Sequence, residues 1–208
     1  MWWFCALLIA VYYLVLDRKV WHLLRQPLLQ ALFVGTLLAL CVLWQLKAQL
    51  PDLPPVHFLG ITTVALLLGL RLTVLVIPLA LLLPQLAALA LGQPVAELNA
   101  FLLQWTTLTL VSLQSYGCYL LISHKLPQHL FVAIFVSGFL NSLCSALTFV
   151  ALLALGFFGV LGAGEDSQIS EFLLVMPLLA MPEALLNGMA LTLLLVYKPH
   201  WVAAYRQT

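Results

Sequence analysis

Charged residues are scarce in this sequence of 208 residues, because Lys, Arg, Asp and Glu together make up only 7% of it. Soluble domains average about 25% charged residues. No polar segment approaches the ~50 residues of the smallest domains, so we expect one transmembrane helical domain over residues 1–208. A net charge of +1 with no basic stripe argues against nucleic acid as a partner.

Enzyme motifs are also missing. The sequence has no H-E-x-x-H, G-x-S-x-G or Walker A motif, and no nucleophile and base at a recognisable spacing. Its 4 cysteines form no C-x-x-C pair and indicate small buried residues rather than disulfides or a zinc site. We therefore expect no enzymatic activity and no covalently bound cofactor, with any ATP hydrolysis on partner chains.

The sequence has long apolar runs instead, and 64% of its residues are hydrophobic. These runs predict an all-α polytopic membrane protein with a bundle of about seven transmembrane helices. A helix needs about 20 residues to cross a hydrocarbon core of ~30 Å. The predicted spans are Trp2–Leu16, Pro27–Leu46, His57–Leu70, Leu72–Leu91, Asn99–Ile122, Leu130–Phe157 and Phe172–Tyr197. The third of them is the shortest.

The basic residues predict the orientation of this bundle. With the N-terminus outside, all of the 8 Lys and Arg residues except Lys47 fall on the cytoplasmic side, as the positive-inside rule requires. The apolar start of the chain precedes Arg18 and Lys19, which predicts a retained first helix rather than a cleaved signal peptide. The C-terminus is then cytoplasmic, and we expect a multi-pass protein of the inner (plasma) membrane.

Glu183 is the most informative polar residue, because it lies near the middle of the apolar run Phe172–Tyr197. A carboxylate at that depth costs roughly 3 kcal/mol in lipid, and such residues usually mark functional sites. Helical spacing puts Asn187 on the same face, one turn later. Two interpretations stay open: a cavity for a substrate, ion or proton, or a structural acid that is protonated and hydrogen-bonded to a neighbouring helix.

Other polar residues in the apolar runs are candidates for the same cavity. They are Asn99 and Gln104 in the fifth span, and Asn141 in the sixth, where small residues four apart predict close helix packing. His57 follows two prolines at the start of the third span, and a neutral imidazole there can bind a metal ion. An ordinary hydrogen-bonding role for His57 is the alternative.

Several of these residues lie in segments that resemble a known family. The segments are Val56–Gly60, Ala96–Asn99, Leu126–Val136, Met181–Gly188 and Tyr197–Trp201. In order and spacing they are similar to the CbiM-like substrate-capture components, the membrane permeases of energy-coupling-factor ABC transporters for cobalt and nickel. The resemblance implies uptake of a divalent transition-metal ion, with a coupling transmembrane subunit and ATPase subunits as partners.

The resemblance also implies the ligands of the ion. In metal-binding members these are the N-terminal amine, a histidine directly after the initiator methionine, and a histidine in an H-x-L-G segment. Met1 and His57 match the first and the last, whereas Trp2 stands at the second position. The substrate therefore differs, or further ligands come from elsewhere. Candidates for such ligands are Glu183, Asn99 and the sulfur atoms of Met1 and Cys5.

Two other functions stay open at this point. The same scaffold could bind and transport a vitamin-like or other small organic ligand, which the missing second-position histidine favours. A membrane scaffold without transport activity is the other alternative, and in that case Glu183 would be only structural.

Overall fold

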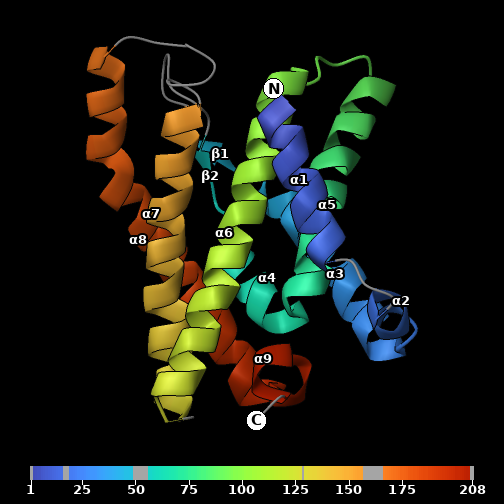
Figure 1. Ribbon diagram of the computed structural model, residues 1–208, viewed down its shortest axis with the longest axis vertical. Helices are drawn as coiled ribbons and strands as arrows, with labels where there is room; N and C mark the ends of the chain where they lie inside the picture. Colours follow the sequence, from blue (N-terminus) through green and yellow to red (C-terminus); the bar gives the residue numbers. More distant parts are fainter. Residues whose placement is uncertain (1, 16–18, 49–55, 128, 157–165, 207–208) are drawn as a thin grey trace.

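A computed structural model of the chain describes residues 2–15, 19–48, 56–127, 129–156 and 166–206 (Figure 1). This part is almost entirely helical, as predicted. The helices are α1 (Trp2–Val15), α2 (Lys19–Leu24), α3 (Pro27–Leu43), α4 (Ile61–Leu68), α5 (Leu70–Ala90), α6 (Leu98–Lys125), the π-helix η1 (Val132–Leu140), α7 (Asn141–Ala154), α8 (Asp166–Tyr197), the 3-10 helix η3 (Pro199–Trp201) and α9 (Ala203–Arg206). Two short antiparallel strands pair between α3 and α4, β1 (Lys47–Ala48) and β2 (Val56–His57).

Within the described residues, 3 segments are long and apolar enough to cross a membrane, namely Leu70–Ala90, Val132–Ala154 and Ala180–Tyr197. They fall on the fourth, sixth and seventh predicted spans. α3 is apolar but shorter, at 17 residues. The helical, membrane-embedded character of the chain is thus confirmed, whereas the count of seven spans and their orientation stay predictions.

The third predicted span, His57–Leu70, forms a helix much shorter than a membrane crossing. α4 has 8 residues, about 12 Å at 1.5 Å per residue, against a core of ~30 Å. Glycines with positive φ bound it, Gly60 at 64° and Gly69 at 77°, and α5 follows directly. Apart from the half-buried Thr63, every residue of α4 is buried. Its ends therefore lie inside the protein, where side chains and backbone can satisfy their polar groups.

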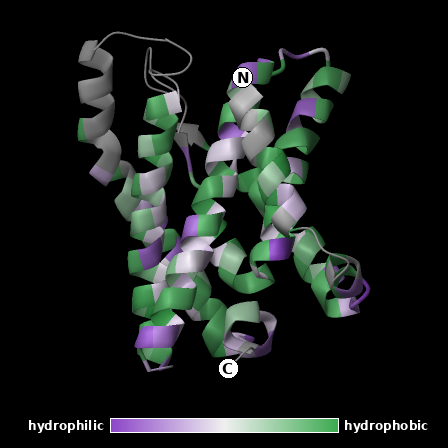
Figure 2. Ribbon diagram, viewed as in Figure 1, coloured by the Kyte–Doolittle hydropathy of each residue, from purple (hydrophilic) through white to green (hydrophobic). Residues whose placement is uncertain are grey.

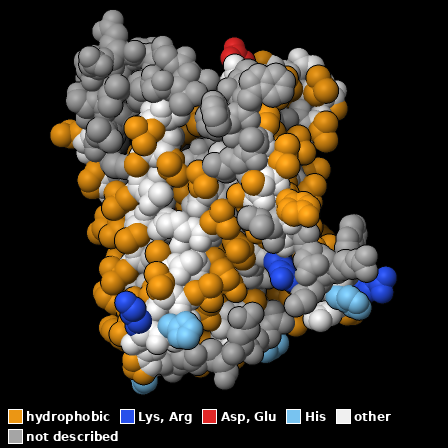
Figure 3. All heavy atoms as spheres, viewed as in Figure 1, with side chains coloured by type: hydrophobic (Ala, Val, Ile, Leu, Met, Phe, Trp, Pro, Cys, Tyr) orange, Lys and Arg blue, Asp and Glu red, His pale blue; other side chains and the backbone are white. Residues whose placement is uncertain are grey.

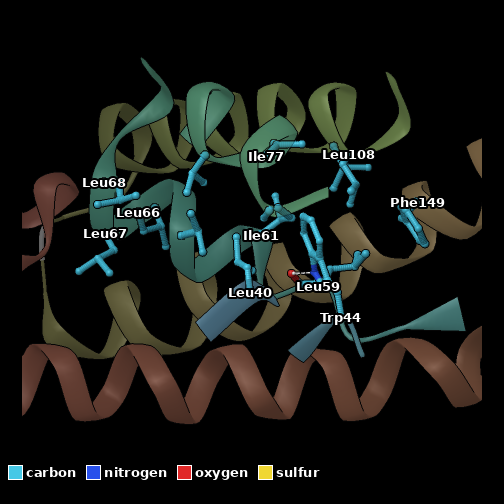
Figure 4. Close-up of a cluster of buried hydrophobic side chains, with 14 of the residues drawn as sticks. Leu40, Trp44, Leu59, Ile61, Leu66, Leu67, Leu68, Ile77, Leu108 and Phe149 are labelled. Carbon is cyan, nitrogen blue, oxygen red and sulfur yellow. Dashed lines mark hydrogen bonds between the residues drawn. The ribbon is translucent and has the colours of Figure 1, made fainter. Parts of the chain in front are cut away.

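The hydrophobic core is built around α4. Figure 4 shows that buried side chains converge on it from the neighbouring helices, including Leu40 of α3, Ile77 of α5, Leu108 of α6 and Phe149 of α7. Ile61 at the start of α4 is fully buried in the same cluster. The close packing fixes the position of the residues just before α4, which include His57.

Polar groups separate toward the ends of the bundle. Hydrophobic residues, green in Figure 2, predominate on the parts of the helices that are not drawn in grey. In the face shown in Figure 3, the coloured Lys, Arg and His side chains lie in the lower half, and the acidic patch in colour lies at the top. The positive-inside rule leads us to expect Lys and Arg to gather at one end of a membrane protein, and which side of the membrane that end faces stays a prediction.

Candidate functional site

His57 lies at the end of β2 in a pocket of aromatic rings. Its side chain is buried, with 6% of its surface exposed. Its ring centroid is 5.6 Å from that of Trp44 and 5.9 Å from that of Phe149. The indole N–H of Trp44 donates to the Leu59 carbonyl at 3.1 Å and so holds the turn after His57 in place (Figure 4).

The hydrogen bonds of His57 define its tautomer. Nδ1 lies 3.1 Å from the Phe58 carbonyl oxygen, which can only accept, so Nδ1 carries the proton. Nε2 lies 2.6 Å from Nε2 of Gln104, an amide nitrogen that donates, so His57 Nε2 accepts with its lone pair. A neutral imidazole whose second nitrogen donates to a carbonyl is the arrangement of most metal-binding histidines.

This geometry gives Gln104 a specific relation to His57. Gln104 is half-buried on α6, and its amide nitrogen occupies the lone pair through which an imidazole would bind a metal ion. An ion that binds His57 must therefore displace this amide nitrogen. Contacts at both ring nitrogens thus fix the orientation of the imidazole.

Glu183 contacts the turn between β2 and α4 rather than His57's ring nitrogens. Its side chain is 3% exposed on α8. One carboxylate oxygen accepts from the backbone N–H of Leu59 at 2.9 Å, and the other from that of Gly60 at 2.8 Å. The first N–H groups of any helix have no partner within the helix. Because α4 is buried, the carboxylate supplies acceptors that water would otherwise provide.

Asn187 extends these contacts by one helical turn. Its Oδ1 accepts from the backbone N–H of Thr63 at 3.0 Å and from the Thr63 hydroxyl at 2.7 Å. Its amide nitrogen donates to a carboxylate oxygen of Glu183 at 2.5 Å. The predicted common face of Glu183 and Asn187 is thus confirmed. We call these two residues the α4 clamp, because together they bind the N-terminal end of α4.

The other predicted site residues lie in different surroundings. Asn141 donates from α7 to the Ser115 carbonyl on α6 at 2.9 Å, which is the interhelical bond that its position suggested. Asn99 is half-buried near the start of α6, and its Oδ1 makes no hydrogen bond within the described residues. Cys5 is half-buried on α1, and Met1 lies outside the described residues.

The sequence did not point to the aromatic walls of the site or to the backbone partners of the clamp. Trp44 ends an apolar run and Phe149 lies inside another, so neither differs in pattern from an ordinary core residue. Gly60 carried the only signal, as a glycine between a candidate ligand and a helix. Its φ of 64° shows that the turn there requires a left-handed conformation.

The described residues do not contain a complete cage for a metal ion. Over these ranges, no group of 3 or more His, Cys, Asp and Glu side chains comes together. An ion bound to His57 would take its other ligands from amide, backbone or solvent oxygens, or from residues such as Met1 outside those ranges.

Comparison with known proteins assigns the family. The family model of CbiM, described as the cobalt uptake substrate-specific transmembrane region, matches residues 1–201. Neither a curated protein nor a solved structure matches the chain. The match covers the candidate site and nearly the whole sequence, and it confirms the resemblance found in the segments around His57 and Glu183. The chain therefore belongs to the CbiM family, a transport component that forms the substrate-specific transmembrane region of cobalt uptake.

Proposed function

We propose that this protein is the substrate-capture permease of an energy-coupling-factor transporter and that it binds a divalent transition-metal ion, such as cobalt or nickel, through Nε2 of His57. The observation that carries this proposal is the position of the His57 ring, with Nδ1 3.1 Å from the Phe58 carbonyl oxygen and Nε2 2.6 Å from the Gln104 amide nitrogen, which fits a neutral imidazole with its lone pair on Nε2. Imidazole nitrogen is a suitable ligand for ions of this part of the transition series.

The α4 clamp holds in place the turn that carries His57. Glu183 fixes the two backbone N–H groups that follow Phe58, so the turn that carries His57 cannot shift without breaking those bonds. Substitution of residues that orient a metal-binding side chain in this way commonly lowers metal affinity by 10–100-fold. We therefore assign Glu183 and Asn187 to positioning the ligand rather than to binding the ion.

The remaining ligands are part of the proposal. The N-terminal amine of Met1 is the first candidate, on the pattern of the family, and the second is Oδ1 of Asn99, which has no hydrogen-bond partner among the described residues. Trp2 provides no ligand of the kind that a histidine would. The proposed site thus has fewer nitrogen donors than that of the metal-binding members described above, and a different preference among cobalt, nickel, copper and zinc is expected.

The membrane arrangement follows from the predicted orientation. With seven crossings, the N-terminus outside and the C-terminus in the cytoplasm, His57 faces the outer side and the basic residues face inward. The ion would be captured from outside and released inward. Hydrolysis of ATP would take place on partner subunits, joined through a coupling transmembrane subunit.

Equilibrium binding of cobalt, nickel, copper, zinc and manganese to the purified full-length protein tests the proposal. We expect tight binding of one of these ions, and an affinity for it that is lower by about 100-fold or more in H57A, because substituting residues that only orient a metal ligand already lowers affinity by 10–100-fold. H124A is the matched control, because His124 is exposed on α6. Equal binding by H57A and wild type would remove His57 from the site.

Failure of the wild type to bind any of the ions would end the metal hypothesis. A small organic molecule that co-purifies with the protein, detected by mass spectrometry, would then support the vitamin-like alternative.

A further inference from the structure

A second cavity lies away from His57, where the ends of three helices meet. It has a volume of about 620 Å³ and is bounded by the end of α1 at Val15, by Gln26 before α3, and by Gly69 and Arg71 at the start of α5. Tyr116 of α6 also contributes to its wall. Since helices that cross a bilayer end near its headgroups, this cavity lies at the level of the membrane–water interface.

Arg71 is the charged group of this cavity, and it is half-buried. No ion pair of Arg71 is present within the described ranges; there, Glu97 is exposed beyond the other end of α5, and Glu183 is bound in the α4 clamp. A partly buried arginine at a membrane is unfavourable unless it meets an anion or water. The guanidinium is therefore open to water or to an anion from outside the described residues.

The remaining wall offers both further donors and an apolar surface. The Tyr116 hydroxyl and the Gln26 amide line the cavity, and neither side chain hydrogen-bonds to another described residue. Leu29 and Leu68 form apolar parts of the same wall. One cation, two uncharged donors and an apolar side suit a group that has a phosphate at one end and a hydrocarbon chain at the other.

We propose that this cavity binds the phosphate headgroup of an anionic phospholipid, with the guanidinium of Arg71 as the principal contact. Arginine binds phosphate through two parallel N–H groups, and basic pockets between transmembrane helices commonly bind anionic headgroups. The apolar wall holds the first carbons of the acyl chains. This site is independent of the proposed metal site, so H57A binds the lipid as wild type does.

The test measures lipid retention by the full-length protein with native mass spectrometry, after reconstitution in mixed phosphatidylglycerol and phosphatidylcholine. We expect wild type to retain phosphatidylglycerol over phosphatidylcholine by about tenfold, and R71Q to lose that preference. K125Q, which removes one exposed positive charge from the end of α6, is the control and keeps the preference. Y116F removes only a hydroxyl and lowers the preference by a few-fold, which provides a second reading if R71Q is poorly folded.

Inorganic phosphate identifies the source of the anion. If phosphate displaces phosphatidylglycerol from wild type only at millimolar concentration, the lipid is the ligand. If phosphate binds in an Arg71-dependent way and the lipid has no advantage over it, the site is a phosphate site for a soluble anion. Retention of phosphatidylglycerol by R71Q and Y116F at the wild-type level, or no preference in wild type, overturns the proposal.

Discussion

Two buried polar pairs lie on either side of the turn between β2 and α4, and they differ in what their atoms are bound to. In the α4 clamp, both carboxylate oxygens of Glu183 accept backbone N–H groups and Asn187 binds Thr63. In the other pair, Nε2 of His57 accepts a hydrogen bond from a side-chain amide, that of Gln104. A side chain can rotate away, whereas the backbone at the start of a packed helix cannot.

In the proposed site, this difference distinguishes residues that stabilise the fold from the residue that binds the ion. A group whose partners are fixed backbone atoms cannot exchange them for a ligand without disrupting α4. A group whose partner is a mobile amide can do so at the cost of one hydrogen bond, about 1 kcal/mol. We accordingly propose that the intramembrane acid, which the sequence makes most prominent, stabilises the fold, and that the histidine at the edge of the apolar run is the residue that can exchange its partner for an ion.

Of the substitutions that test this comparison, E183A should lower the stability most, because it removes the carboxylate of the α4 clamp. The backbone N–H groups of Leu59 and Gly60 and the amide of Asn187 would lose their acceptor. At 1–3 kcal/mol for each buried unsatisfied group, we expect the free energy of unfolding to fall by about 3 kcal/mol or more. Thermal unfolding of the purified protein in detergent measures this.

Two companion variants make the test specific. E183Q keeps one good acceptor oxygen and should lose roughly half as much stability as E183A. E97A removes a carboxylate that is exposed before α6 and should unfold as wild type does. An E183A protein with an unchanged unfolding temperature would show that the carboxylate does not hold α4.

Asn187 should have the second-largest effect. In N187A the backbone N–H of Thr63 loses its acceptor, and the carboxylate of Glu183 loses a donor, so we expect a loss of about 2 kcal/mol. T192A, one turn or so further along α8, removes a hydroxyl that bonds only to the Gly188 carbonyl of its own helix and should cost less. Equal losses in N187A and T192A would argue against a clamp of two residues.

Much of this architecture was predictable from the sequence, and the part that was not has a physical reason. Apolar runs located the long helices, and the helical repeat put Glu183 and Asn187 on one face, because both depend on local spacing. The target of that face was not predictable. It is the backbone of Leu59, Gly60 and Thr63, which lies more than 120 residues away along the chain, and backbone groups leave no pattern in a sequence.

The length of α4 was missed for a related reason. Apolar composition runs on both sides of Gly60 and up to Leu70, so hydropathy alone predicts the span His57–Leu70, whereas α4 covers only Ile61–Leu68. Glycine is compatible with a helix but also permits a positive φ, and the sequence does not say which applies. The structure shows a φ of 77° at Gly69, which separates the two helices.

Gly60 offers a smaller and more local test of the same turn. A side chain in its left-handed conformation costs about 1–2 kcal/mol, and a Cβ atom there would lie 3.1 Å from Cδ2 of Leu43. We expect G60A to lose about that much stability and, because the turn carries His57, some metal affinity as well. G35A is the control, since a Cβ atom at Gly35 meets open space. A G60A protein as stable as G35A would show that the turn adapts.

Substitution of Gln104 should have the smallest effect, and it tests most directly whether an ion replaces the hydrogen bond between His57 and Gln104. In Q104A, Nε2 of His57 no longer has a hydrogen bond that an ion must break, so metal affinity should rise by about fivefold, equivalent to about 1 kcal/mol. Q114A, a substitution of the same type on α6, should leave the affinity unchanged, because Gln114 bonds to Cys118 instead. If Q104A lowered the affinity, Gln104 would bind the ion through its amide oxygen, and both partners of the pair would then be ligands. Titration of Q104A and Q114A beside wild type, with the ion that wild type binds most tightly, decides whether the ion displaces Gln104 or is bound by it.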